Sequence, residues 1–167
     1  GLFDNFYSDE KEMSIFSYTP NPPQRRGYTF EFSKYLGEKY NLPVKFKPLH
    51  THKDFAYLTQ KQFIELWSPS LFHVNLDPYI TQPGQQGIQV ACVGSLNIGG
   101  MNESHQLLFP ETAVPDLNAI EEKFREYLLD EKSRFRAIEY AWDKVNELYS
   151  FDVVKQQLLD VVDKYDG

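Results

Sequence analysis

The chain has 167 residues, of which 41% are hydrophobic, and this size predicts one domain whose core needs neither disulfides nor a structural metal. Its 17 Lys and Arg against 24 Asp and Glu give a net charge of −7, which argues against a broad surface for nucleic acid or for an anionic membrane. No apolar run is long enough to span a bilayer, so we expect no transmembrane segment.

The first two thirds of the chain predict alternating strands and helices. Short apolar runs indicate the strands, and aromatic and aliphatic residues at three- and four-residue spacing indicate the helices. Proline-containing stretches such as Pro20–Pro23 and Leu42–Pro43 separate these elements. We expect strands at 13–18, 44–47, 71–76, 88–93 and, shorter than the others, 106–109, with helices at 28–40 and 55–66.

The last third changes character, because residues 116–165 contain neither Gly nor Pro and show helical spacing throughout. We expect helices that begin near Asp116, Ser133 and Ser150, each a residue type that caps helix starts. Alternating strands and helices followed by closing helices predict an α/β fold. In this fold a mostly parallel sheet of about five or six strands lies between two helical layers, as a Rossmann-like three-layer αβα domain over residues 1–167.

A paired glycine, Gly99-Gly100, follows the apolar run of residues 88–93 and precedes Glu103. Paired glycines let backbone N–H groups approach a ligand that any Cβ would block, and a helix N-terminus behind them favours an anion. The alternative is a plain reversal of the chain. Glu103 either complements the helix start electrostatically or bonds a ribose or sugar hydroxyl.

Ligands of open parallel sheets bind at the carboxyl ends of the strands. The loops that carry Arg25, Arg26, Asn75, Asp77 and the glycine pair should converge there. The two arginines follow the first strand and precede a helix start, so they either hold a diphosphate or form a solvated basic turn.

Other reactive side chains favour structural roles. His73 alternates with apolar residues in a strand, which favours a packed histidine over a general base. His50 and His52 lack a third ligand at fitting spacing, so we expect no metal site. Cys92 has no partner cysteine and predicts a small buried thiol in a reducing compartment. The chain contains neither a dinucleotide-binding G-x-G-x-x-G after the first strand, nor a P-loop, nor a G-x-S-x-G elbow.

Several segments, in order, resemble those of the C-terminal half of GT-B glycosyltransferases, in particular the group 1 retaining enzymes. Gln24-Arg-Arg-Gly27 is similar to the basic loop of that family. Ser68-Pro-Ser70, the stretch Gly87-Ile-Gln-Val-Ala91 and Gly99-Gly-Met-Asn-Glu103 resemble its Pro-Ser, Gly-x-Pro-Val and Gly-Gly-x-x-Glu segments. The closing pattern is similar in residues 107–111, Asp116, Ala141 and residues 149–151, after which the family's final helix crosses to the other domain.

The resemblance implies a donor-binding domain for a UDP-, GDP- or ADP-linked sugar, with the diphosphate held by Arg25, Arg26 and Gly27. No metal or other cofactor is expected. The family's E-x7-E pair is absent, since no glutamate occurs between Glu65 and Glu103, so Asp77 or Gln82 would have to bond the ribose. Glycosyl transfer to a glycan or other acceptor would need an N-terminal domain, and we expect the isolated chain to be inactive.

Two alternatives stay open. The missing glutamates would allow a non-catalytic GT-B-like scaffold or chaperone subunit in glycan or glycoprotein assembly. A weaker alternative is an unrelated flavodoxin-like binding domain. For the donor-binding domain we expect a cytoplasmic location, peripheral at the membrane through the missing domain. The start at Gly1, without signal-peptide features, indicates a processed or excised form.

Overall fold

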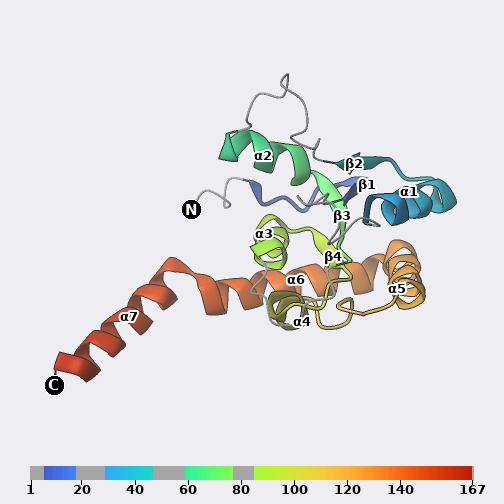
Figure 1. Cartoon of the computed structure of the whole chain (residues 1–167). Helices are drawn as coiled ribbons and strands as arrows, with labels where there is room; N and C mark the ends of the chain where they lie inside the picture. Colours follow the sequence, from blue (N-terminus) through green and yellow to red (C-terminus); the bar gives the residue numbers. More distant parts are fainter. Residues whose placement is uncertain (1–5, 18–28, 47–58, 77–84, 167) are drawn as a thin grey trace.

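A computed structural model describes residues 6–17, 29–46, 59–76 and 85–166. Within these ranges the fold is α/β, with a sheet of four parallel strands (Figure 1). The strands are β1 (Glu12–Ser17), β2 (Val44–Phe46), β3 (Ser70–Val74) and β4 (Leu96–Ile98), in the spatial order β2-β1-β3-β4. The two central strands, β1 and β3, are therefore neighbours although α1, β2 and α2 separate them in the chain.

Seven helices accompany the sheet in the described residues. They are α1 (Thr29–Tyr40), α2 (Gln60–Trp67), α3 (Gln85–Val93), α4 (Glu103–Leu108), α5 (Leu117–Leu129), α6 (Glu131–Tyr149) and α7 (Phe151–Asp166). The predicted strands near 13–18, 44–47 and 71–76, the helix at 28–40 and the three closing helices are confirmed. Asp116 caps α5 as expected, by accepting a hydrogen bond from the Ala119 N–H at 2.9 Å. The second closing helix begins earlier than predicted, because Asp130 and not Ser133 is its N-cap.

Two predicted strands are helices. Residues 88–93 belong to α3, and residues 106–109 overlap α4 and its C-cap, Phe109. The strand between them, β4, lies in a three-residue stretch that the sequence analysis assigned to no element. As a result, the described part of the chain holds four strands rather than five or six.

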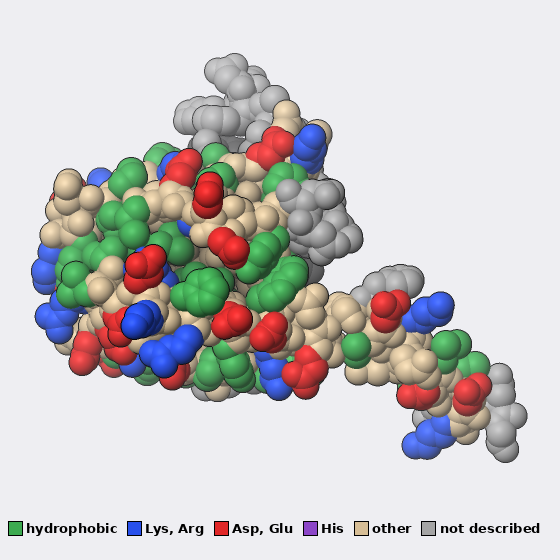
Figure 2. Space-filling view, turned by 180° about the vertical axis from the view of Figure 1, so that it is seen from behind, with side chains coloured by type: hydrophobic (Ala, Val, Ile, Leu, Met, Phe, Trp, Pro, Cys, Tyr) green, Lys and Arg blue, Asp and Glu red, His purple; other side chains and the backbone are tan. Residues whose placement is uncertain are grey.

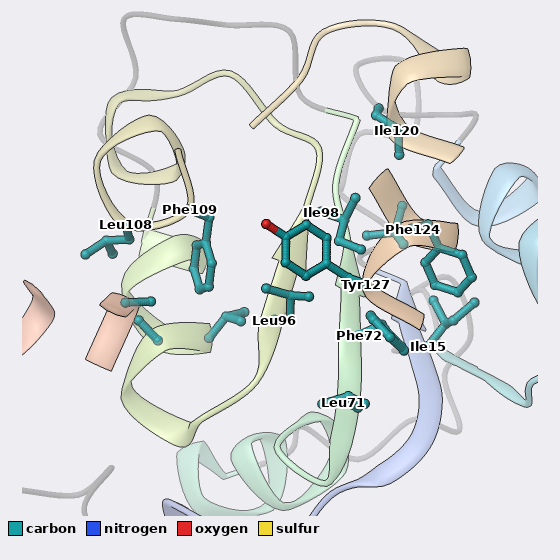
Figure 3. Packing of buried hydrophobic residues seen from close by; sticks show 14 of the residues in the cluster. Ile15, Leu71, Phe72, Leu96, Ile98, Leu108, Phe109, Ile120, Phe124 and Tyr127 are labelled. Carbon is teal, nitrogen blue, oxygen red and sulfur yellow. The ribbon is translucent and has the colours of Figure 1, made fainter. Parts of the chain in front are cut away.

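One face of the sheet packs against α1 and α5. Ile15 and Phe72 are paired across the two central strands and share a buried cluster with Leu36 of α1 and Phe124 of α5. The rings of Phe72 and Phe124 lie 4.9 Å apart. Figure 3 shows Ile15, Phe72 and Phe124 together with Tyr127, one turn further along α5, over the strands. Burial of these apolar side chains holds α1 and α5 to the sheet.

The other face packs against α2 and α3. Phe16 shares a buried cluster with Ile64 and Trp67 of α2 and with Val93 of α3. His73 is paired with Phe16 across the sheet and is fully buried on the same face, with the Trp67 ring edge-on to it at 5.4 Å. The prediction of a packed histidine is thus confirmed. The sheet carries helices on both faces.

Burial lowers the pKa of His73 to about 3, with a smaller contribution from the charge of Lys11, while backbone groups of Ser70 and Trp67 oppose the shift. The unfolded chain binds a proton on this residue below pH 6.5 that the folded chain does not bind. His73 should therefore lower the free energy of unfolding as the pH falls from 6.5 towards 3, by about 1.4 kcal/mol per pH unit.

We expect urea unfolding at pH 7.5 and pH 5.5 to reveal this loss, and His73→Gln to reduce the difference between the two pH values by about 1 kcal/mol. The variant keeps His105, so the pH dependence that remains belongs to other groups. An equal pH dependence in both proteins would show that folding does not lower the pKa of His73.

The C-terminal helix α7 extends away from the rest of the fold (Figure 1). It leaves large aliphatic side chains in solvent, among them Val154, Leu158, Leu159, Val161 and Val162. Figure 2 shows this projecting helix from behind, with hydrophobic and charged side chains both on its surface. None of the helices in the described ranges is both long enough and apolar enough to cross a membrane.

Candidate functional site at the carboxyl edge of the sheet

The candidate site lies where β1 and β3 end. The chain leaves β1 towards β2 on one side and leaves β3 towards β4 on the other, so the strand order reverses between these two neighbours. In open parallel sheets this reversal opens a crevice beyond the carboxyl ends of the two strands, and ligands bind there. Ser17 and Val74 are paired at the ends of these strands, and Asn75 follows directly.

Two buried hydroxyl groups belong to residues at the end of β1 and the start of α1. Ser17 ends β1 and Thr29 begins α1; both are at most 1% exposed. Neither hydroxyl has a hydrogen-bond partner among the described residues. Buried hydroxyls are nearly always paired, and the first N–H groups of a helix also lack partners within the helix. The start of α1 thus offers donors of two kinds.

A row of amide side chains links the end of β3 to α3 and β4. Asn75 donates from Nδ2 to Oε1 of Gln86 on α3, and Nε2 of Gln86 lies 3.5 Å from Oδ1 of Asn97 on β4. Asn97 in turn donates to the carbonyl of Gly99 at 2.8 Å. All three amides are buried, and their mutual bonds satisfy polar groups that would otherwise be costly to desolvate. This amide row fixes the glycine pair relative to the end of β3.

Gly99 and Gly100 both have positive φ, at 82° and 80°. A Cβ on Gly99 would lie 2.2 Å from the carbonyl oxygen of Asn75, and one on Gly100 would lie 2.0 Å from Nδ1 of His105. The glycines are therefore required both by the backbone conformation and by close packing of the chain on itself. The predicted convergence of Asn75 with the glycine pair is confirmed.

The glycine pair does not offer both of its N–H groups to a ligand. Gly99 donates its N–H to the carbonyl of Thr112 at 2.8 Å, whereas the Gly100 N–H donates to no described residue. Thr112 also donates its hydroxyl to the carbonyl of Asn97 at 2.6 Å, so the turn after α4 braces β4 and the glycine pair together. A phosphate cradle built on Gly99 is excluded by this bond, which leaves Gly100 as the available donor.

Glu103 is the first residue of α4 and is exposed. The side-chain cap of this helix is the preceding residue, Asn102, which accepts a hydrogen bond from the His105 N–H at 3.0 Å. Glu103 complements the helix start by its charge, as one of its two interpretations expected. A bond to a ribose stays a prediction.

The remaining predicted site residues, Arg25, Arg26, Gly27, Asp77 and Gln82, lie outside the described residues. They belong to the segments that follow β1 and β3 in the chain, the two strands between which the strand order reverses. The sequence analysis missed Ser17, Thr29, Gln86 and Asn97, which carry no recognised motif.

Two further expectations concern metal and thiol chemistry. Among the residues that the structure describes, no group of three or more His, Cys, Asp or Glu side chains could hold a metal ion. His50 and His52 are outside these residues. Cys92 lies in α3 rather than in a strand and is half-buried, so the prediction of a strand position is wrong.

A comparison with models of known protein families finds no match for this chain, and a comparison with characterised proteins also finds none.

Proposed function

We propose that this chain is the nucleotide-sugar-binding half of a two-domain GT-B glycosyltransferase, with a Rossmann-like three-layer fold. The observation that carries the proposal is the reversal of strand order between β1 and β3, beyond whose carboxyl ends ligands bind in open parallel sheets. There the buried hydroxyls of Ser17 and Thr29, the start of α1 and the Gly100 N–H all supply donors. The chain that leaves β1 continues into the basic Gln24-Arg-Arg-Gly27 segment.

These groups suit a donor diphosphate. Helix N-termini and hydroxyls donate hydrogen bonds to phosphate oxygens, and arginine adds charge-assisted bidentate bonds. In the proposed reaction Arg25 and Arg26 stabilise the negative charge that develops on the diphosphate as the sugar leaves. Ribose contacts would come from Asp77, Gln82 or Glu103.

The projecting helix α7 supports a second domain. Leu158 is 62% exposed, and four neighbouring aliphatic side chains on the same helix are between 41% and 52% exposed. Such a stripe is normally covered by another surface. In the proposed enzyme the N-terminal domain covers α7 and contributes the acceptor side of the cleft, so the isolated chain binds donor but transfers no sugar.

The alternative is a non-catalytic scaffold or chaperone subunit in glycan or glycoprotein assembly. One observation favours it, namely the absence of any glutamate between Glu65 and Glu103. Without that side chain the ribose contact and the catalytic electrostatics of the family would both be weakened. In that case the chain would keep the fold of the family but would not bind a nucleotide sugar.

A ligand-observed NMR titration of the chain with UDP, GDP and ADP distinguishes the donor-binding domain from the scaffold. We expect saturable binding of one nucleotide and a loss of at least about 30-fold in affinity for Arg25→Ala/Arg26→Ala, since a hydrogen bond to a charged group contributes about 2 kcal/mol. The matched control is Lys155→Ala/Lys164→Ala, which removes the same charge from exposed positions on α7.

The control should bind like the original protein. Binding of none of the three nucleotides, or equal weakening by both double variants, would overturn the proposed donor site and favour the scaffold. Sugar transfer by the isolated chain would contradict the expected dependence on a second domain.

A further inference from the structure

A hollow of about 520 Å³ lies on the surface between α5, α6 and the turn that follows α4. This volume falls within the range of about 300–1,000 Å³ that is typical of small-molecule sites. The proposed donor site uses none of its exposed side chains. The hollow is therefore a candidate for a second ligand.

A fixed hydrogen-bond acceptor stands at one wall. The buried phenol of Tyr127 donates to Oε2 of Glu111, and burial together with this carboxylate raises the pKa of Tyr127, so the phenol stays a donor. The other carboxylate oxygen, Oε1, has no hydrogen-bond partner among the described residues. Since Tyr127 is 1% exposed and held in the core, it keeps the Glu111 carboxylate at one position in the hollow.

A donor stands at another wall. The exposed guanidinium of Arg136 donates to the Ser133 hydroxyl at 3.2 Å, and no carboxylate of the described chain lies within ion-pair distance of it. Glu126, which also lines the hollow, is paired with Lys123 at 3.1 Å. Arg136 thus keeps several N–H donors for a ligand.

The ring of Tyr140 supplies an apolar wall. It lines the hollow from α6 and is 47% exposed, and Pro110 and Ala137 add further apolar surface. An aromatic face in solvent beside fixed polar groups suits a ligand that has an apolar face and a polar edge.

Charge decides which ligand class fits. An anion would face Glu111 and Glu126, and a cation would face Arg136. A neutral ligand that carries several hydroxyl groups suits both the carboxylates and the guanidinium, because a hydroxyl donates to a carboxylate and also accepts from a guanidinium. A pyranose ring has such hydroxyls at its edge and presents C–H groups on its face.

We propose that this hollow binds a neutral pyranose unit of an oligosaccharide, with its hydroxyls bridging Glu111 and Arg136 and its C–H face on Tyr140. The site is independent of the proposed donor site, because the residues that recognise the ligand differ. In an enzyme that extends glycans it would hold a part of the chain away from the reacting end.

The test is a two-dimensional NMR titration of the ¹⁵N-labelled chain with maltotriose, cellotriose, mannotriose and triacetylchitotriose, with inorganic phosphate in parallel. We expect saturable shifts of the Ser133 and Ala137 amides with at least one trisaccharide and none with phosphate. Tyr140→Ala should weaken that binding about 5- to 10-fold, through loss of the stacked ring.

Tyr149→Ala is the matched control, because Tyr149 lies on the same helix, is 43% exposed and does not line the hollow. It should leave the affinity unchanged. Glu111→Gln keeps an acceptor for Tyr127 and should also weaken binding, so the test does not depend on one variant. Absence of shifts with all four trisaccharides, equal binding by the Tyr140 variant, or phosphate binding at these amides would overturn the proposal.

The trisaccharide site and the nucleotide site can be tested independently of each other. Arg25→Ala/Arg26→Ala should leave trisaccharide binding intact, and Tyr140→Ala should leave nucleotide binding intact. Loss of trisaccharide binding in the arginine variant would contradict an independent site.

Discussion

Gly99→Ala is expected to lower the free energy of unfolding by about 2–5 kcal/mol. The left-handed backbone at φ 82° costs a non-glycine residue about 1–2 kcal/mol. The new methyl group would also lie 2.2 Å from the Asn75 carbonyl oxygen, a backbone atom that cannot turn aside, and such overpacking adds about 1–3 kcal/mol. Equilibrium unfolding in urea measures the loss.

Gly94→Ala separates the two causes. Gly94 has a similar φ of 78°, but its nearest neighbour would be a side-chain atom of Tyr7 at 2.9 Å, with the Ser8 carbonyl at 3.1 Å. A ring can shift more easily than a strand-end carbonyl, so this variant should lose less stability. Equal losses at both positions would show that backbone conformation alone, and not contact with Asn75, requires glycine in the pair.

Phe124→Ala is expected to cost about 3–5 kcal/mol, the range for removing a large aromatic side chain from a core. Phe124 is fully buried on α5, with Phe72 of β3 at 4.9 Å and Tyr40 of α1 at 5.4 Å between ring centres. Its removal leaves a cavity where helix, sheet and helix meet (Figure 3). Urea or thermal unfolding measures the effect.

Leu129→Ala on the same helix is the control, because Leu129 is 79% exposed and its truncation should change stability by less than about 0.5 kcal/mol. A loss below about 1 kcal/mol for Phe124→Ala would contradict the packing of α5 against this face of the sheet.

Helices whose apolar residues recur with a clear helical period could be predicted from the sequence. α1, α5 and α6 each alternate buried and exposed positions along the helix, and their sequences carry that spacing. α3 was misassigned because the run Ile88-Gln-Val-Ala-Cys-Val93 is apolar and rich in β-branched residues, as a buried strand would be. In the fold Val90, Ala91 and Val93 are fully buried and the other residues of this run are half-buried, so the run has no exposed polar face to reveal a helical period.

β4 and the extent of α4 were missed for a different reason, since residues 106–109 were predicted as a strand. Three residues of strand and six of helix are too short for any period to emerge. The helix start expected behind the glycine pair is confirmed at Glu103, and its N-cap is Asn102, which the sequence analysis did not consider.

The site was predictable only where it depends on topology. A parallel sheet brings the residues after its strands to one edge, so the meeting of Asn75 with the glycine pair followed from the order of elements. The amide row did not follow, because Gln86 comes from α3, which was predicted as a strand, and Asn97 from β4, which was not predicted. Their hydrogen bonds require the exact placement of two elements that the sequence misassigned.

The amide row has a consequence for how a ligand would be selected. The buried hydroxyl and amide side chains at this edge of the sheet are polar, but none of them gains or loses a proton at ordinary pH; they belong to Ser17, Thr29, Asn75, Gln86 and Asn97. These side chains therefore present the same dipoles to a ligand from mildly acidic to mildly alkaline pH. Preference for the charge of a ligand must then reside in the exposed Glu103 and in the segments that follow β1 and β3, where substitution can redirect specificity while the buried amides stay unaltered.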